Sequence, residues 1–167
     1  RSSGVWKCPA DVYQSPANPG PRVRSISVNA ILVGSTVTVG SEPMFPLGRK
    51  YINKATKTGV VTVPGAANVF VTVDEHPDSI NDAVFHVVPG NVPAQYGWRD
   101  LPASYHNGAC GFSFADGHSE IKKWKDSRTR QAVHMETKWW APSGNNFSVR
   151  DSVDVAWIVD RMPFTQQ

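Results

Sequence analysis

Asp116 and Gly117 stand between two short runs in which apolar and polar residues alternate, and this dipeptide constrains the fold more than any other feature. A two-residue type I′ turn requires positive φ at both central positions, and Asp-Gly is among the pairs that tolerate it. The dipeptide therefore predicts a β-hairpin with these two residues at its tip. Because side chains alternate between the faces of a strand, the predicted register places Phe112 opposite Ile121 on the core side and His118 on the other side.

The rest of the sequence predicts more strands and little helix. β-branched runs separated by turn signals occur at 60–63, 69–73 and 83–88. Residues 1–21 read as an irregular lead-in rich in Pro, Gly and Ser, and residues 153–162 read as a short helix with Ser152 as its N-cap. We therefore predict one globular domain over 1–167, of mainly β (α+β) class, with an antiparallel sheet, long Pro/Gly-rich loops and a short C-terminal helix.

The composition excludes several classes of protein. Hydrophobic residues make up 40% and charged residues 19% of the 167 residues, which indicates a folded domain with a real core. The net charge of +3 is mild and no nucleic-acid-binding motif accompanies it, so no nucleic acid is expected as a partner. The longest aliphatic run, 30–33, is far too short for a membrane span.

Several segments together resemble one bacterial family. His106 precedes Asp116-Gly117 by nine intervening residues, and four further segments follow the order found in that family. These segments are Cys8-Pro9-Ala10-Asp11, Arg24 to Ala30, Asn68 to Glu75, and Asp154 to Ile158. On these residues the chain resembles the prepilin-type, processing-associated proteins, which are pilin-like or pseudopilin-like. Precursors of that family begin with a basic leader and a hydrophobic helix, whereas this sequence opens on Arg1 inside the expected globular part.

The resemblance implies a fold, a function and a location. It implies a pseudopilin-like head domain that works as a structural subunit of a filament or secretion apparatus, through self-association or contact with other pilin-like subunits. It implies an exported protein at the cell surface, outside the cell or in the periplasm. Such oxidising compartments permit disulfides, so Cys8 and Cys110 either form a disulfide or remain two buried thiols.

Acidic and histidine side chains suggest a metal site. The candidate ligands follow a strand, precede the hairpin or occupy its tip, and they are Asp74, His76, Asp78, His106, Asp116 and His118. Oxygen ligands favour Ca²⁺, which some pseudopilins carry, while histidines leave Zn²⁺ or Cu²⁺ as alternatives. The alternative without metal is a set of solvated loop carboxylates beside a structural His106.

Two further hypotheses compete with the structural subunit. Trp98, Trp139 and Trp140 could be subunit contacts, or platforms that stack on the sugar rings of a polysaccharide. A metal-dependent enzyme could use the acidic and histidine cluster. No Gly-x-Ser-x-Gly nucleophile elbow and no phosphate-binding glycine loop occurs in the sequence, so we predict a protein that is not an enzyme.

Overall fold

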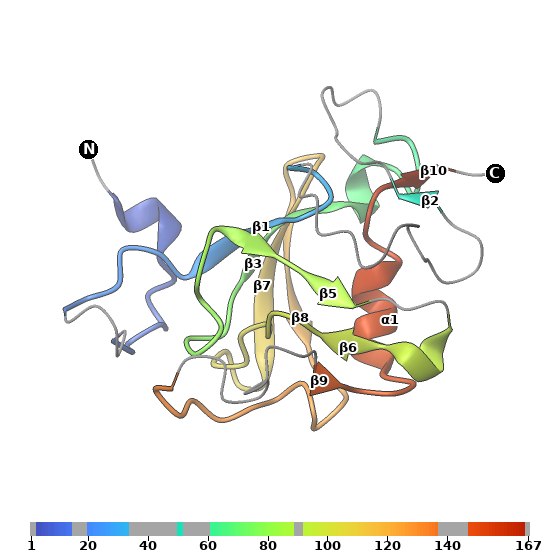
Figure 1. Ribbon diagram of the computed structural model, residues 1–167. Coiled ribbons are helices and arrows are strands. Elements are labelled where there is room, and N and C mark those ends of the chain that lie inside the picture. Colours follow the sequence, from blue (N-terminus) through green and yellow to red (C-terminus); the bar gives the residue numbers. More distant parts are fainter. Residues whose placement is uncertain are drawn as a thin grey trace.

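The computed structural model describes residues 3–14, 20–33, 50–51, 61–88, 92–136 and 147–165, and in them the fold is mainly β with one short α-helix (Figure 1). The elements are η1 (Ser3–Trp6), β1 (Ile26–Asn29), β2 (Lys50–Tyr51), η4 (Ala66–Asn68), β3 (Phe70–Asp74), β4 (Val84–Phe85), β5 (Val87–Val88), η5 (Pro93–Gln95), β6 (Gly97–Trp98), β7 (Ala109–Phe114), β8 (Ser119–Lys123), β9 (Phe147–Ser148), α1 (Val153–Val159) and β10 (Phe164–Thr165). The predicted fold class is confirmed.

The main sheet has five strands in the order β4-β1-β3-β7-β8. Its neighbours are antiparallel except for β1 and β4, which run parallel, so the predicted antiparallel sheet is in fact mixed. The other described strands form a three-stranded sheet, β5-β6-β9, and a two-stranded pair, β10-β2. The central pair, β3 and β7, places the end of β3 beside the start of β7.

The hairpin of β7 and β8 is present, but its register differs from the prediction. Phe112 pairs with Glu120, not with Ile121, and Gly111 pairs with Ile121. The Phe114 amide donates to the His118 carbonyl oxygen, so the loop holds three residues and Gly117 has a φ of 95°. A type I turn followed by a left-handed glycine makes such a loop. The extra residue moves Ile121 to the other face, where it is 65% exposed.

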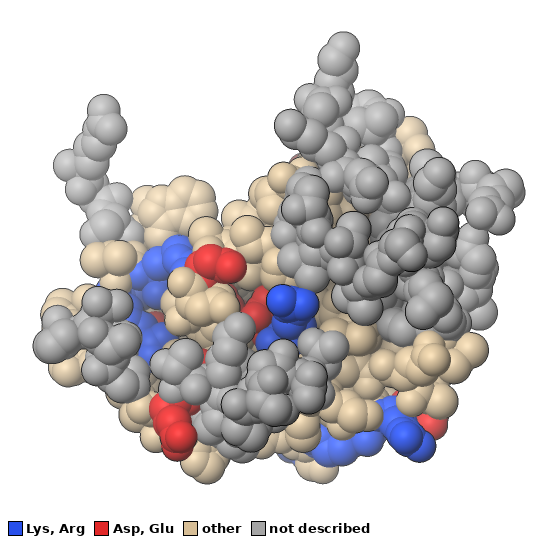
Figure 2. All heavy atoms as spheres, in the orientation of Figure 1, with Lys and Arg blue, Asp and Glu red and all other residues tan. Residues whose placement is uncertain are grey.

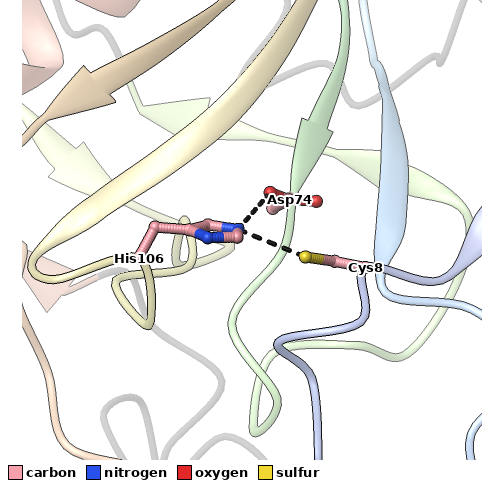
Figure 3. Close-up of side chains that lie close together, drawn as sticks. All are labelled: Cys8, Asp74 and His106. Carbon is pink, nitrogen blue, oxygen red and sulfur yellow. Dashed lines mark hydrogen bonds and ion pairs between the residues drawn. The ribbon is translucent and has the colours of Figure 1, made fainter.

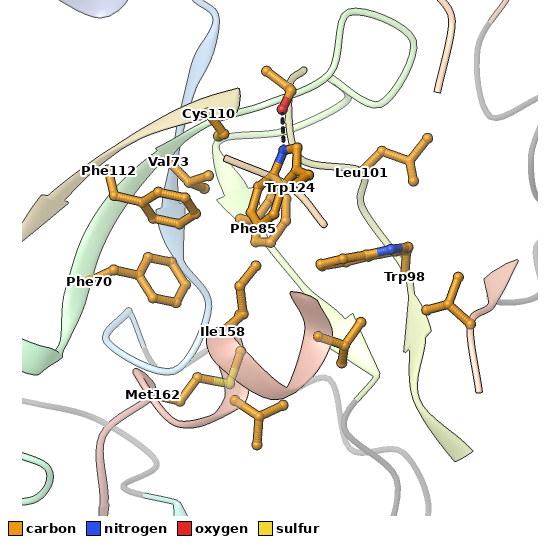
Figure 4. Packing of buried hydrophobic residues seen from close by; sticks show 14 of the residues in the cluster. Phe70, Val73, Phe85, Trp98, Leu101, Cys110, Phe112, Trp124, Ile158 and Met162 are labelled. Atoms are coloured by element: carbon orange, nitrogen blue, oxygen red, sulfur yellow. Dashed lines mark hydrogen bonds between the residues drawn. The ribbon is translucent and has the colours of Figure 1, made fainter. Parts of the chain in front are cut away.

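Helix α1 covers one face of the main sheet and completes the hydrophobic core (Figure 4). Ser152 caps its first turn by accepting a hydrogen bond from the Val155 amide at 3.5 Å, as the sequence predicted, and the helix ends at Val159 rather than at residue 162. Ile158 is fully buried against the sheet. The ring of Trp157 meets that of Phe112 edge-on, with centroids 5.0 Å apart. The sheet is therefore fixed on one side by tightly packed aromatic rings.

Candidate functional site

Asp74, the last residue of β3, is the centre of the candidate site. Its Oδ2 accepts a hydrogen bond from the Gly111 amide at 3.1 Å and lies 3.2 Å from His106 Nε2. A Cβ atom at position 111 would stand only 2.7 Å from that oxygen, so only glycine leaves room for the carboxylate. Pairing of β3 with β7 thus brings an acidic side chain against the backbone of the neighbouring strand.

His106 is held by a tight turn that leads into β7. Asn107 and Gly108 both have positive φ, 54° and 75°, a conformation that Asn and Gly adopt most readily. The Gly108 amide donates to the Ser104 carbonyl oxygen at 2.9 Å, and the His106 amide donates to Ala109 O at 3.4 Å. The turn directs the imidazole toward Asp74 while the side chain keeps 27% of its surface exposed.

Cys8 completes the site from the lead-in. Its amide donates to Ser25 Oγ at 2.7 Å, and the Ser25 amide donates to Trp6 O at 2.9 Å, so the lead-in is tied to the segment that enters β1. Its Sγ lies 3.2 Å from His106 Nε2 (Figure 3). In the part of the chain that the structure describes, this is the one group of three His, Cys, Asp or Glu side chains whose ligand atoms all lie within 4.8 Å of one another.

Burial controls the protonation of the site. It raises the pKa of the Asp74 carboxyl, while the Gly111 amide and His106 act in the opposite direction. Burial also raises the pKa of the Cys8 thiol, and the nearby Asp74 raises it further. A thiol with a raised pKa carries little thiolate at neutral pH and is a poor nucleophile. Burial and the neighbouring carboxylate of Asp74 therefore both favour the protonated form of this thiol.

His76 and Asp78, also predicted as ligands, have structural roles of their own. His76 Nε2 lies 3.2 Å from the Gln131 carbonyl oxygen, while Nδ1 accepts a hydrogen bond from the Asp78 amide. The Asp78 carboxylate accepts hydrogen bonds from two backbone amides, His134 at 2.6 Å and Glu136 at 3.2 Å. These buried side chains fasten residues 131–136 to the sheet and do not join Asp74 and His106 in the group of ligand atoms.

Asp116 and His118 form a separate pair at the exposed hairpin tip. Their side chains contact each other at 2.6 Å, and this contact lowers the pKa of the Asp116 carboxyl. Asp116 Oδ1 also accepts a hydrogen bond from the His118 amide at 3.1 Å, which is ordinary turn chemistry. The predicted set of six ligands is therefore divided into three separate pairs, and among the described residues only the pair Asp74 and His106 belongs to a group of three possible ligands.

The structure also departs from the predicted disulfide. Cys8 and Cys110 are both free cysteines. The Cys110 thiol is buried in the core and donates to the Asp74 carbonyl oxygen at 3.1 Å, whereas the Cys8 sulfur faces His106. The two sulfur atoms therefore have different polar neighbours and are not bonded to each other in this structure.

Of the three tryptophans predicted as subunit contacts or glycan platforms, only Trp98 lies among the described residues. Trp98 is fully buried, with its ring 6.4 Å from that of Trp124, so it cannot stack on a sugar at the surface. Trp139 and Trp140 lie outside the described residues. No tryptophan that the sequence singled out therefore offers a glycan platform within the described part of the chain.

Charged side chains of both signs are mixed on one face of the molecule. On the face shown in Figure 2, basic side chains lie in small groups with acidic ones beside them. Among the helices of the described segments, none has the length and apolar character needed to cross a membrane.

Comparison of the chain with protein-family models, with curated proteins and with solved structures finds no match.

Proposed function

We propose that this chain is the head domain of a pilin-like or pseudopilin-like exported protein, and that it acts as a structural subunit through self-association or contact with related subunits. The proposal places it outside the cytoplasm, at the cell surface or in the periplasm. It requires no catalytic turnover. Support comes from the roles of the residues that carry the resemblance and from an exposed apolar surface on the lead-in.

The observation that carries the proposal is that acidic residues of the resembling segments are buried and bound to the backbone. Both oxygens of Asp154 accept hydrogen bonds from the Lys125 amide at 3.1 Å, and Oδ2 also accepts one from the Asp126 amide at 2.8 Å. Asp11 is buried and accepts a hydrogen bond from the Tyr13 amide at 3.1 Å. Buried carboxylates bound in this way hold loops in place, which is a role expected of them in a structural subunit.

The lead-in supplies the surface for contact. Three large apolar side chains of the lead-in are more than half exposed, Val5 (75%), Trp6 (53%) and Val12 (78%), and Val23 (71%) follows directly after it. Single exposed apolar residues are common, but several on one short segment are typical of an interaction site. Trp is also among the residues enriched at protein interfaces. We infer that this segment meets a second pilin-like subunit.

Sedimentation velocity over a concentration series, with imaging of negatively stained particles, tests the proposal. The purified chain should form larger species as its concentration rises. The double variant Trp6→Ser/Val12→Ser should shift the equilibrium toward monomer, because it removes apolar surface from the lead-in.

A matched control removes exposed apolar side chains elsewhere. Ile121→Ser/Val153→Ser changes residues that are 65% and 56% exposed on the hairpin and on α1, and it should assemble like the unchanged chain. A chain that stays monomeric at every concentration contradicts self-association. Equal loss of assembly in both double variants contradicts the role of the lead-in.

A further inference from the structure

Three side chains from distant parts of the sequence converge on one point. Cys8 comes from the lead-in, Asp74 from the end of β3 and His106 from the turn before β7 (Figure 3). The Cys8 Sγ to His106 Nε2 distance and the His106 Nε2 to Asp74 Oδ2 distance are both 3.2 Å. The side chain of His106 is 27% exposed and that of Asp74 is 10% exposed, so a small ion can reach the group from solvent.

The sulfur and the carboxylate oxygen both approach the same ring nitrogen, Nε2. An imidazole nitrogen carries either one proton or one lone pair, so the two partners must share a single hydrogen bond there, and sulfur is only a weak partner. In a catalytic triad the nucleophile and the carboxylate face opposite ring nitrogens, which is a different geometry. Convergence of sulfur, nitrogen and oxygen is instead the geometry of metal coordination.

We propose that Cys8, Asp74 and His106 bind one Zn²⁺ ion, with a water molecule in the fourth position. Zinc takes sulfur at about 2.3 Å and nitrogen or oxygen at about 2.0–2.2 Å, so tetrahedral ligands stand about 3.3–3.6 Å apart. The two distances of 3.2 Å that involve His106 Nε2 are within a few tenths of an ångström of that range, and the third pair, the Cys8 sulfur and an Asp74 carboxylate oxygen, lies within 4.8 Å. Ca²⁺ takes six to eight oxygen ligands and does not suit a sulfur and a nitrogen.

The surroundings favour a cation. The Gly111 amide donates to Asp74 Oδ2 and fixes the carboxylate, as groups behind metal ligands commonly do. Asp11 lies on the same turn as Cys8, since its amide donates to Cys8 O at 3.0 Å. It is 1% exposed, and its Oδ2 has no hydrogen-bond partner among the described residues. This oxygen atom, on the same turn as Cys8, is therefore a polar group near the site without a partner among the described residues.

Zinc at this position would fasten the lead-in to the sheet. Cys8 is 98 residues from His106 in the sequence, and the metal would join the two segments directly. Binding requires the thiolate, so the Cys8 thiol would release its proton to solvent. The inference stands on the geometry of the three side chains and is independent of the proposed function.

Titration of the full chain with Zn²⁺ and Co²⁺ tests the proposal. The protein is stripped with chelator, kept reduced and titrated with Zn²⁺ in a calorimeter, and we expect one ion per chain and a higher melting temperature. Co²⁺ reports the ligands, because a cysteine thiolate gives a charge-transfer band in the near ultraviolet. Cys8→Ser should abolish that band, and Cys8→Ser and His106→Gln should each weaken Zn²⁺ binding at least tenfold.

His118→Gln is the matched control, because it removes an exposed histidine that also contacts an aspartate. It should bind Zn²⁺ like the unchanged chain, and circular dichroism should show that all variants are folded. The proposal is overturned if the folded chain binds no Zn²⁺, or if it binds Cu²⁺ alone. A Co²⁺ complex without the thiolate band, or equal losses in His106→Gln and His118→Gln, also overturns it.

Discussion

Gly111→Ala should destabilise the protein by crowding Asp74, even though alanine is ordinarily the better residue in regular structure. Gly111 lies in β7 without a positive φ, so its backbone conformation is open to alanine. The added Cβ would stand 2.7 Å from Asp74 Oδ2 and 3.5 Å from Asp74 Cγ, whereas Ile121 Cδ1 would be in ordinary contact at 3.8 Å. The carboxylate must therefore move away from its partners.

The magnitude follows from the contacts that are disturbed. Asp74 is 7% exposed and Oδ2 has two partners, the Gly111 amide and His106 Nε2. A hydrogen bond to a charged group contributes about 1.5–3 kcal/mol, and both are weakened together. Replacing glycine by alanine also raises the free energy of unfolding by about 0.4–1 kcal/mol, because alanine restricts the unfolded chain. We expect a net loss of about 2 kcal/mol, which for a domain of this size lowers Tm by about 4–8 °C.

Urea denaturation followed by tryptophan fluorescence measures this loss, and a double-mutant cycle identifies its cause. In an Asp74→Ala background the oxygen that clashes is gone, so Gly111→Ala should cost little there. If Gly111→Ala lowers the free energy of unfolding equally in both backgrounds, contact with Asp74 is not the reason for glycine at this position. A Gly111→Ala variant as stable as the unchanged chain would refute the reasoning altogether.

Three further predictions concern the hairpin, the helix and the interior. Gly117→Val should lower the free energy of unfolding by about 1–2 kcal/mol, because φ is 95° there, and an unchanged Tm would speak against the turn. Ser152→Ala should cost about 1 kcal/mol in urea denaturation by removing the cap of α1, whereas the exposed Ser148→Ala should be neutral. Burial raises the pKa of the Glu75 carboxyl from 4.5 to about 8, and the nearby carboxylate of Asp100 is the next largest cause. The folded state therefore binds the Glu75 proton more tightly than the unfolded state does. The free energy of unfolding should therefore fall as pH rises from 4.5 to 8, and Glu75→Gln should flatten that dependence if Glu75 is its source.

Local signals in the sequence predicted the elements but not their register. Ser152 before an apolar run identified the start of α1, and Asp116-Gly117 identified the hairpin. The loop also includes Ala115, and no local preference distinguishes a two-residue loop from a three-residue loop with glycine at its end. One residue reversed the face of Ile121, because side chains alternate with a period of two.

Strand β1 is a second case in which the pattern of apolar residues does not identify the buried face. Ile26 and Val28 alternate with polar residues, a pattern that favours an apolar face toward the core, yet Ser27 and Asn29 are the buried residues of this strand. Asn29 Nδ2 donates to the Phe70 carbonyl oxygen at 3.0 Å, and Ser27 Oγ donates to the buried Glu75 carboxylate. The strand therefore buries its polar side chains in hydrogen bonds that form only after the chain has folded.

Two of the three side chains of the candidate site were predicted as ligands from the sequence. Asp74 ends β3 and His106 precedes β7, so pairing of these strands brings the two together, as the sequence suggested. Asp116 follows the same strand that His106 precedes. A strand of six residues spans about 20 Å, so the spacing itself separates these two side chains. Cys8 was predicted as a disulfide partner and not as a ligand, since its place beside His106 depends on contacts between distant segments, such as the hydrogen bond of its amide to Ser25.

Two kinds of buried carboxylate can be distinguished in this protein. Asp154 and Asp78 have both oxygens bound by backbone amides, and neither side chain belongs to a group of possible metal ligands among the described residues. Asp74 Oδ2 instead lies beside a histidine nitrogen that also faces a cysteine sulfur, so the two partners compete for one position on the ring. Carboxylates of the first kind hold the fold together, whereas Asp74 belongs to the site proposed for zinc. Because the site lies where the lead-in meets the sheet, occupancy by zinc would govern how firmly the apolar lead-in surface is held against the domain.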